Sequence, residues 1–172
     1  MRIFNPILPA FALALVLSTS VQAQSKSTPH SHAPKPVQAA PVIDVPANTR
    51  DAVDISDRFS RVLKAGDMKG VETLLASDVL ILESGGAEHS RQEYLSHHAI
   101  SDAAFLKNAH SQLLRRTARR DGDTVWIGSE SELHATKDGK ALTLLSTETM
   151  VLRRSGDDWR IVHIHWSSRP KK

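Results

Sequence analysis

The chain has 172 residues, of which 40% are hydrophobic, and its formal net charge at pH 7 is +3. This length suits one domain and excludes a large enzyme with a separate nucleotide-binding half. The lack of cysteine excludes disulfides, thiol nucleophiles and cysteine zinc sites. Lys and Arg are spread along the chain, so we expect no nucleic-acid partner.

The first 23 residues have the pattern of a secretory signal peptide. Arg2 is their only charge, an apolar stretch runs from residue 7 to residue 17, and Val21-Gln22-Ala23 fits a cleavage site. The stretch is too short for a comfortable membrane span, and no second one follows. We therefore expect no membrane span after cleavage and a secreted protein located in the periplasm; an uncleaved anchor is the alternative.

Residues 24–50 are predicted to be a flexible linker. They hold five of the eight prolines in the chain, mixed with Ser, Ala and Lys. Such a composition cannot bury enough apolar surface to offset the entropy lost on ordering. The folded domain is therefore predicted over residues 51–172.

Two helices are predicted at the start of this domain. The first carries apolar residues at i, i+4, i+7 and i+8, namely Ile55, Phe59, Val62 and Leu63. Gly66 stands where a glycine ends a helix, and Asp67 can cap a short second helix. Residues 79–83 form a β-rich run that ends at a Gly85-Gly86 turn.

A third helix is predicted from a capping box at Ser90 and Glu93 to about Lys107. At 100° per residue, one stripe of this helix contains Tyr94, His97, His98, Ser101 and Phe105, with Asp102 at its margin. This helix thus presents titratable side chains beside its packing face.

Four long strands follow, separated by turns at residues 121–123, 137–140 and 155–158, in the pattern of an antiparallel meander. With two-residue loops, Ser129 is expected opposite Glu148 and Ser131 opposite Ser146. The same assumption places Met150 opposite His163 and Glu148 opposite His165. A one-residue bulge in any strand would exchange the two faces.

With this register, one face has an apolar floor and a polar mouth, as a small-molecule pocket needs. The polar mouth would comprise Ser129, Ser131, Ser146, Glu148, His163, His165 and Ser167. The opposite face would be apolar enough for a homodimer interface, with Trp126, Leu145, Val151, Val162, Ile164 and Trp166.

Residues 159–167, with the pattern W-x-I-V-H-x-H-x-S, resemble the last strand of DUF4440-type members of the NTF2-like (SnoaL-like) superfamily. A second set is similar to a signature of a secreted bacterial subgroup: residues 83–86, Glu88, Ser90, Glu93, Tyr94, His97, His98, Asp102 and Phe105. The resemblance covers residues 51–169. It implies an α+β cone, in which N-terminal helices pack on a strongly curved, mainly antiparallel sheet, usually as a dimer.

Members of this superfamily resembling ketosteroid isomerase use a carboxylate base, and those resembling scytalone dehydratase use His, Asp and Tyr. Neither pattern matches this chain position by position, so no catalytic residue is carried over. From the residues themselves, Glu148 beside His165 is the leading acid–base pair, because a partly buried carboxyl has a raised pKa unless it is paired. The alternative is a cross-strand pair that satisfies two buried polar groups.

Further candidates come from the third helix and from the sheet. Tyr94 and His98 could share catalysis with Glu148 and His165, and Asp102 could orient His98. The candidate ligand-binding set comprises Glu83, Tyr94, His97, His98, Asp102, Arg116, Glu148, His163 and His165. A structural polar network is the alternative for the helix residues. No cofactor is expected; the less favoured metal set is His98, Asp102, His163 and His165.

Three functions are compatible with these patterns. The first is a secreted domain that binds a small molecule, and the second is a cofactor-free isomerase or dehydratase with a Glu/His/Tyr pocket. The third is a homodimeric assembly module with a vestigial pocket. No phosphate loop, nucleophile elbow or dinucleotide fingerprint occurs in the chain.

Overall fold

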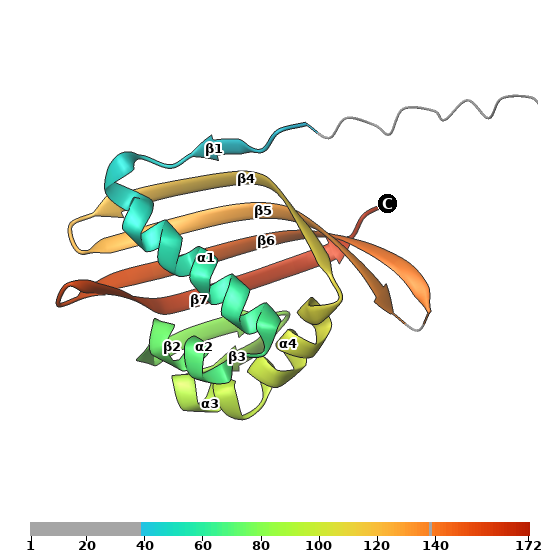
Figure 1. Ribbon diagram of the computed structural model, residues 1–172, viewed down its shortest axis with the longest axis horizontal. Helices are drawn as coiled ribbons and strands as arrows, with labels where there is room; N and C mark the ends of the chain where they lie inside the picture. The colour runs from blue at the N-terminus through green and yellow to red at the C-terminus, as the bar shows by residue number, and fades with distance from the viewer. Residues whose placement is uncertain (1–38, 138) are drawn as a thin grey trace, which may run out of the picture. The chain divides into compact units, whose positions relative to one another are not determined.

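The structure is a computed structural model that describes residues 39–137 and 139–172; the predicted signal peptide lies outside these residues. The described part forms a seven-stranded sheet in the order β1-β4-β5-β6-β7-β2-β3, and α1 crosses one face of it (Figure 1). The β1–β4 and β2–β7 pairs are parallel and the others are antiparallel. The predicted α+β class, with helices on a mainly antiparallel sheet, is confirmed.

The first two helices form as the sequence predicts. Helix α1 (Arg50–Ala65) ends at Gly66, which has a φ of 74° and donates its N–H to the Leu63 carbonyl. Helix α2 (Met68–Leu74) is capped by Asp67, whose carboxylate accepts the Gly70 N–H at 2.9 Å. These helix-ending and capping interactions involve only residues close in sequence, so the structure contains them as the sequence predicts.

The hairpin after α2 differs from the prediction by one residue. Strands β2 (Leu75–Glu83) and β3 (Gly86–Glu88) pair with Glu83 opposite Gly86, so the turn residues are Ser84 and Gly85. Their φ angles are 46° and 90°, as a type I′ turn requires at both central positions. Ser84 is the only non-glycine residue with positive φ in the described ranges.

The predicted third helix is two helices, α3 (Arg91–Ser96) and α4 (His98–Lys107). Its start is as expected, because the Ser90 hydroxyl accepts the Glu93 N–H at 3.1 Å. The Glu93 carboxylate accepts the N–H of His89 at 2.7 Å rather than that of Ser90. At His97 the backbone leaves the helical region, with φ −137° and ψ −77°, so the stripe predicted through this residue does not continue.

The long strands form the predicted meander. They are β4 (His110–Asp121), β5 (Thr124–Lys137), β6 (Lys140–Ser155) and β7 (Asp158–Pro170). The predicted pairs of β5 with β6, Ser129 with Glu148 and Ser131 with Ser146, are confirmed.

A bulge in β7 changes the predicted pairing of β6 with β7. Leu152 lies opposite Ile161 and Val151 lies opposite His163, which leaves Val162 without a partner. Beyond the bulge Met150 pairs with Ile164, Glu148 with Trp166 and Thr149 with His165. The predicted pairs of Met150 with His163 and Glu148 with His165 are therefore wrong.

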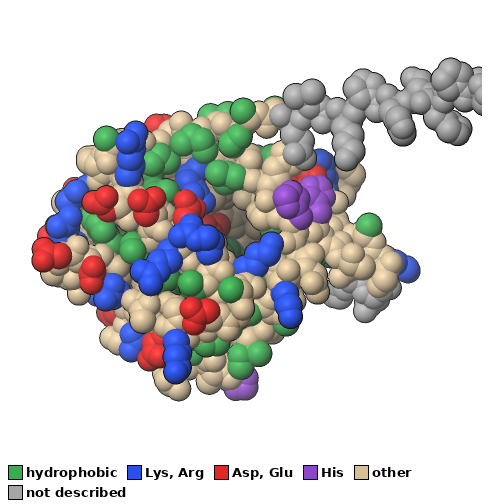
Figure 2. Space-filling view, in the orientation of Figure 1, with side chains coloured by type: hydrophobic (Ala, Val, Ile, Leu, Met, Phe, Trp, Pro, Cys, Tyr) green, Lys and Arg blue, Asp and Glu red, His purple; other side chains and the backbone are tan. Residues whose placement is uncertain are grey.

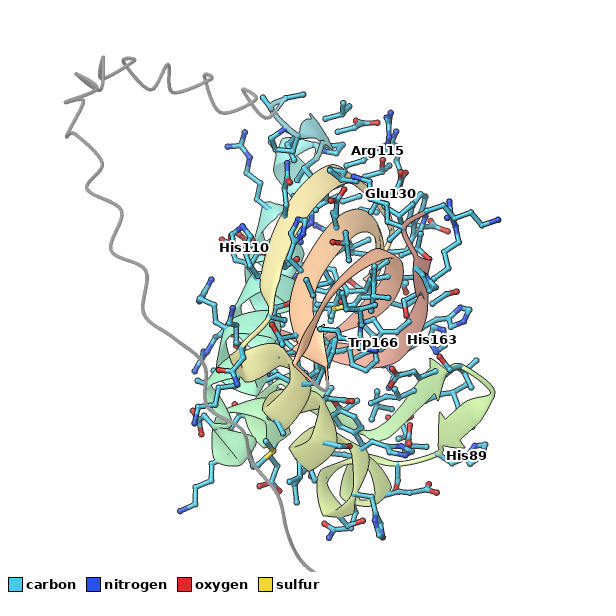
Figure 3. The ribbon with its side chains drawn as sticks, turned by 90° about the vertical axis from the view of Figure 1, so that its right-hand side faces the viewer. His89, His110, Arg115, Glu130, His163 and Trp166 are labelled. Carbon is cyan, nitrogen blue, oxygen red and sulfur yellow. The ribbon has the colours of Figure 1, made fainter. Side chains whose placement is uncertain are left out.

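Side-chain burial gives the physical reason for the bulge. Ile161 and Ile164 are both fully buried although they are three residues apart. Strict alternation would put them on opposite faces, so an extra residue between them is required to bury both. As a result Trp166 turns inward and His163 outward (Figure 3), while His165 is exposed. Ile164 and Trp166, which were expected on the apolar outer face, therefore lie on the inner face. Trp126 lies on the outer face as expected and is 44% exposed.

Regular structure is already present before the predicted domain boundary. Strand β1 (Val42–Asp44) pairs in parallel with β4, and the 3₁₀ turn η1 (Ala47–Thr49) leads into α1. Arg119 binds the Asp44 carboxylate at 2.5 Å, and Thr49 is buried. The linker predicted over residues 24–50 therefore does not describe residues 42–49, because the free edge of β4 offers them backbone partners that composition does not reveal.

The core lies between the helices and the inner face of the sheet. Its largest fully buried side chains include Phe59, Leu63, Leu74, Ile81, Tyr94, Ile127, Met150, Leu152, Ile161 and Ile164. Among the described residues no helix has the length and apolar character needed to cross a membrane.

Ile164→Ala and His165→Ala form a matched test of the bulged register. We expect Ile164→Ala to lower the free energy of unfolding by about 2–5 kcal/mol, because it leaves a cavity in the core. His165→Ala should change it by less than about 0.5 kcal/mol, since this side chain is exposed. Urea unfolding of both variants measures this, and a larger loss for His165→Ala would contradict the register.

Candidate functional site

A cavity of about 320 Å³ lies between the helices and the inner face of the sheet. Its apolar wall includes Phe59 and Leu63 from α1, Phe105 and Leu106 from α4, Leu113, Leu133 and Trp166. Its polar lining includes Asp57, Ser60, Lys64, Glu83, Ser84, Asp102, Ser111, Arg116, Ser129, Ser131, Ser146, Glu148, Ser167 and Ser168. An apolar body with a limited number of charged groups is typical of a small-molecule site.

The Glu148 carboxyl is held inside this cavity by an aromatic partner. The indole N–H of Trp166 donates to Glu148 Oε2 at 2.8 Å, and the Trp166 ring lies 6.4 Å from the Phe59 ring and 6.3 Å from the Tyr94 ring. Loss of water on burial raises the pKa of Glu148. The Trp166 hydrogen bond and the charge of Arg116 lower this pKa, but burial is the larger effect.

Arg116 pairs with helix α1 rather than with Glu148. Its guanidinium donates to Asp57 Oδ1 at 2.6 Å and to the Ser129 hydroxyl at 3.3 Å. The Arg116 side chain is 14% exposed and that of Asp57 is 41% exposed. This pair joins helix α1 to the sheet at the cavity wall and gives Arg116 a carboxylate partner other than Glu148.

A second acidic group lies where α3, α4 and β2 meet. The Tyr94 hydroxyl donates to Asp102 Oδ2 at 2.9 Å, and Tyr94 is fully buried. Burial raises the pKa of both Asp102 and Glu83, and the charge of Asp102 adds to the rise for Glu83. Burial and the neighbouring carboxylates also raise the pKa of Tyr94, so this hydroxyl stays protonated and serves as a donor.

The structure brings four of the predicted site residues to the cavity: Glu83, Asp102, Arg116 and Glu148. Tyr94 does not line the cavity itself, but its hydroxyl donates to Asp102, which does. His97 and His98 instead line a second cavity of about 280 Å³, together with Ala87, Glu88, Glu93 and Ser101.

His163 and His165 do not share the cavity. The His163 ring contacts the Leu80 carbonyl at 2.9 Å on the outer side of β2, and His165 is exposed. The predicted coupling of Glu148 to His165 is wrong, because the bulge at Val162 puts these residues on opposite faces.

The bulge at Val162 also divides the less favoured metal set of His98, Asp102, His163 and His165, because it puts His163 and His165 on the outer face. In the ranges that the structure describes, no three His, Asp or Glu side chains are placed to share a metal ion.

Sequence reasoning missed Asp57, Lys64 and Trp166 as cavity residues. A polar stripe of Asp57, Ser60 and Lys64, at i, i+3 and i+7 beside the apolar stripe of α1, could have indicated the first two. Nothing in the local sequence marks Trp166 as inward-facing, since its orientation depends on the bulge.

The raised pKa of Glu148 predicts a pH-dependent stability. Above the ordinary value of 4.5, an unfolded chain releases the proton that native Glu148 still holds, so unfolding becomes easier as pH rises. Glu148→Gln keeps an oxygen for the Trp166 N–H and cannot ionise. We therefore expect this variant to gain stability relative to wild type between pH 4.5 and the native pKa.

Urea unfolding at a series of pH values measures this difference. Glu72→Gln, at an exposed position, controls for the loss of a carboxyl group. A difference between Glu148→Gln and wild type that does not vary with pH would contradict the assignment.

Comparison with known proteins places this architecture in a family. The model of the SnoaL-like domain matches residues 53–170. A candidate ketosteroid isomerase from Shewanella frigidimarina NCIMB 400 is 30% identical, with a TM-score of 0.65, over 73% of this chain and 99% of that chain. No curated protein matches the chain.

Two more distant structures share the fold. A candidate association domain of calcium/calmodulin-dependent protein kinase II from Xanthomonas campestris is 20% identical, with a TM-score of 0.63, over 79% of this chain and 99% of that chain. A candidate dehydratase of the NTF2-like family from Streptomyces avermitilis is 17% identical, with a TM-score of 0.62, over 71% and 96%. The chain belongs to the SnoaL-like domain family, within the NTF2-like superfamily.

Proposed function

We propose that this protein binds a small, uncharged organic molecule in the Glu148 cavity. The observation that carries the proposal is a cavity of about 320 Å³ with apolar walls and an inward Glu148 carboxyl. This volume lies at the lower end of the range usual for small-molecule sites. An open cavity supports binding over a vestigial pocket.

The charges on the wall support an uncharged ligand. Carboxyl groups of Asp57, Glu83, Asp102 and Glu148 line the cavity. Of its two cationic side chains, Arg116 is paired with Asp57, and Lys64 donates to the neutral Ala109 carbonyl at 2.7 Å. Four carboxyl groups thus face two cations, one of which already has a carboxylate partner, and this balance disfavours a carboxylate or phosphate ligand.

The polar lining supports a ligand with a carbonyl or hydroxyl group. A carboxyl whose pKa is raised keeps its proton to higher pH and can donate it in a hydrogen bond. Serine hydroxyls beside Glu148, including Ser129 and Ser146, can donate or accept. The apolar body of the ligand would lie against Phe59, Leu63 and Trp166.

The second candidate function is a cofactor-free isomerase or dehydratase. It is favoured by the Glu83–Asp102 group, because one cavity then holds two separate acidic centres with raised pKa values. The candidate ketosteroid isomerase at 30% identity supports the same chemistry. In this second function Glu148 transfers the proton, and the Tyr94 hydroxyl donates a hydrogen bond to Asp102. His165 takes no part in the reaction.

We further propose secretion to the periplasm and a homodimer. The signal pattern in residues 1–23 supports secretion. The exposed Trp126 on the outer face supports association through that face, and a likeness in fold to an association domain is compatible with it.

A matched pair of probes tests the ligand class. At pH 7, 1-acetonaphthone is expected to bind at least about tenfold more tightly than 1-naphthoate, since the two share the ring system and differ in charge. Isothermal titration calorimetry measures both dissociation constants. Equal or tighter binding of the naphthoate would overturn the proposal for an uncharged ligand.

Two neighbouring substitutions locate the binding site. Ser146→Leu fills the cavity and should abolish binding of 1-acetonaphthone, whereas Thr147→Leu points to the exposed outer face and should leave it unchanged. Binding that survives Ser146→Leu would place the ligand elsewhere.

A further inference from the structure

Glu88, the last residue of β3, is the only carboxylate among the buried polar residues of the described chain, with 4% exposure. Burial of a carboxylate costs several kcal/mol unless a partner compensates its charge. The small-molecule function proposed above makes no use of this residue. Its position therefore requires another explanation.

The partner of Glu88 is a histidine with an open side. His98 Nδ1, at the start of α4, contacts Glu88 Oε1, and the two side chains are 55% and 5% exposed. The ring lies beside the β2–β3 turn, where a Cβ placed on Gly86 would be 4.0 Å from His98 Cε1. Because Nδ1 faces the carboxylate, Nε2 is the ring nitrogen left to exchange protons.

The side chains of His98 and Glu88 line the second cavity of about 280 Å³, and the exposure of His98 makes its imidazole reachable from solvent. Asp102 follows four residues later on α4, which places it on the same side of the helix, and it lines the main cavity. The charge of His98 lowers the pKa of both Asp102 and Glu83, so the imidazole is electrostatically coupled to that acidic group.

We propose that Glu88 and His98 form a second acid–base centre, in which His98 Nε2 exchanges protons with solvent at the second cavity and the charge of His98 acts on the Glu83–Asp102 group. Glu88 is the positioning residue: its carboxylate accepts from Nδ1–H and so holds the tautomer in which Nε2 carries the lone pair. The proposal rests on the proposed function only in that Glu83 and Asp102 line the ligand cavity.

Among the neighbouring carboxylates, Glu88 is the one that contacts the His98 ring. From α3, Glu93 lines the same cavity, but its carboxylate accepts the His89 N–H. From β2 and α4, Glu83 and Asp102 face the main cavity, and Asp102 accepts from the Tyr94 hydroxyl. His97 is exposed and lines the second cavity without a carboxylate contact among the described residues.

Acylation by diethyl pyrocarbonate tests the dyad without any ligand. Nε2 attacks one carbonyl carbon and forms an N–C bond, and the C–O bond to the ethyl carbonate group breaks. The Nδ1 proton leaves with that group, which decomposes to ethanol and carbon dioxide. A carboxylate on Nδ1–H makes Nε2 more nucleophilic, so at pH 8 we expect His98 to react faster than the adjacent, exposed His97.

Glu88→Gln should slow acylation of His98 by roughly threefold or more while leaving the rate at His97 unchanged. Peptide mass spectrometry of the full-length protein reports the rate at each histidine. Equal rates at His98 and His97 in the wild type, or an unchanged His98 rate in a folded Glu88→Gln variant, would overturn the dyad.

A second measurement tests the coupling and does not depend on the folding of Glu88→Gln. His98→Gln retains an N–H for Glu88 and removes the imidazolium charge, so the pKa of Asp102 should rise in carboxyl ¹³C NMR titrations. His97→Gln should leave it unchanged. If His98→Gln leaves the Asp102 titration unchanged, the coupling of His98 to the Glu83–Asp102 group is overturned, whereas failure of 1-acetonaphthone to bind would overturn only the ligand proposal.

Discussion

The need to bury both Ile161 and Ile164 determines the inner surface of this domain. Two residues three apart on a regular strand face opposite ways, and the unpaired Val162 resolves this conflict. The same bulge turns Trp166 inward, where its ring packs near Phe59 and Tyr94 and its N–H holds Glu148. Core packing in one strand thereby creates the polar anchor of the cavity.

The cavity concentrates carboxyl groups where water is scarce. Burial raises the pKa of Glu83, Asp102 and Glu148, and each proton kept by the folded state is one that an unfolded chain would release. Such groups lower stability at neutral pH, so packing alone does not account for them. Their position around an open space is what a binding or acid–base function explains.

The break between α3 and α4 gives Tyr94 and His98 different surroundings. Tyr94, before the break, is buried and supports Asp102 through a hydrogen bond. His98, directly after it, turns toward β3 and meets Glu88. In a single continuous helix these two residues, four apart, would share one face, so the irregular backbone at His97 is what lets Tyr94 enter the core while His98 meets Glu88.

Local sequence determined the helix ends, the tight turns and the class of the fold. Gly66, Asp67 and Ser90 act on backbone groups within a few residues, so their roles could be predicted without the rest of the chain. The pairing of β5 with β6 was predictable for the same reason, because a two-residue loop sets its register and puts Ser129 beside Glu148.

Only the tertiary structure decided which residues face the cavity. The inward turn of Trp166 and the outward turn of His163 and His165 follow from the burial of both Ile161 and Ile164, which regular alternation along the strand cannot give. The contact of Glu88 with His98 likewise joins a hairpin and a helix whose relative placement depends on the packed sheet. A one-residue change of register reverses every later side chain, so a strand pattern alone could not have identified these partners.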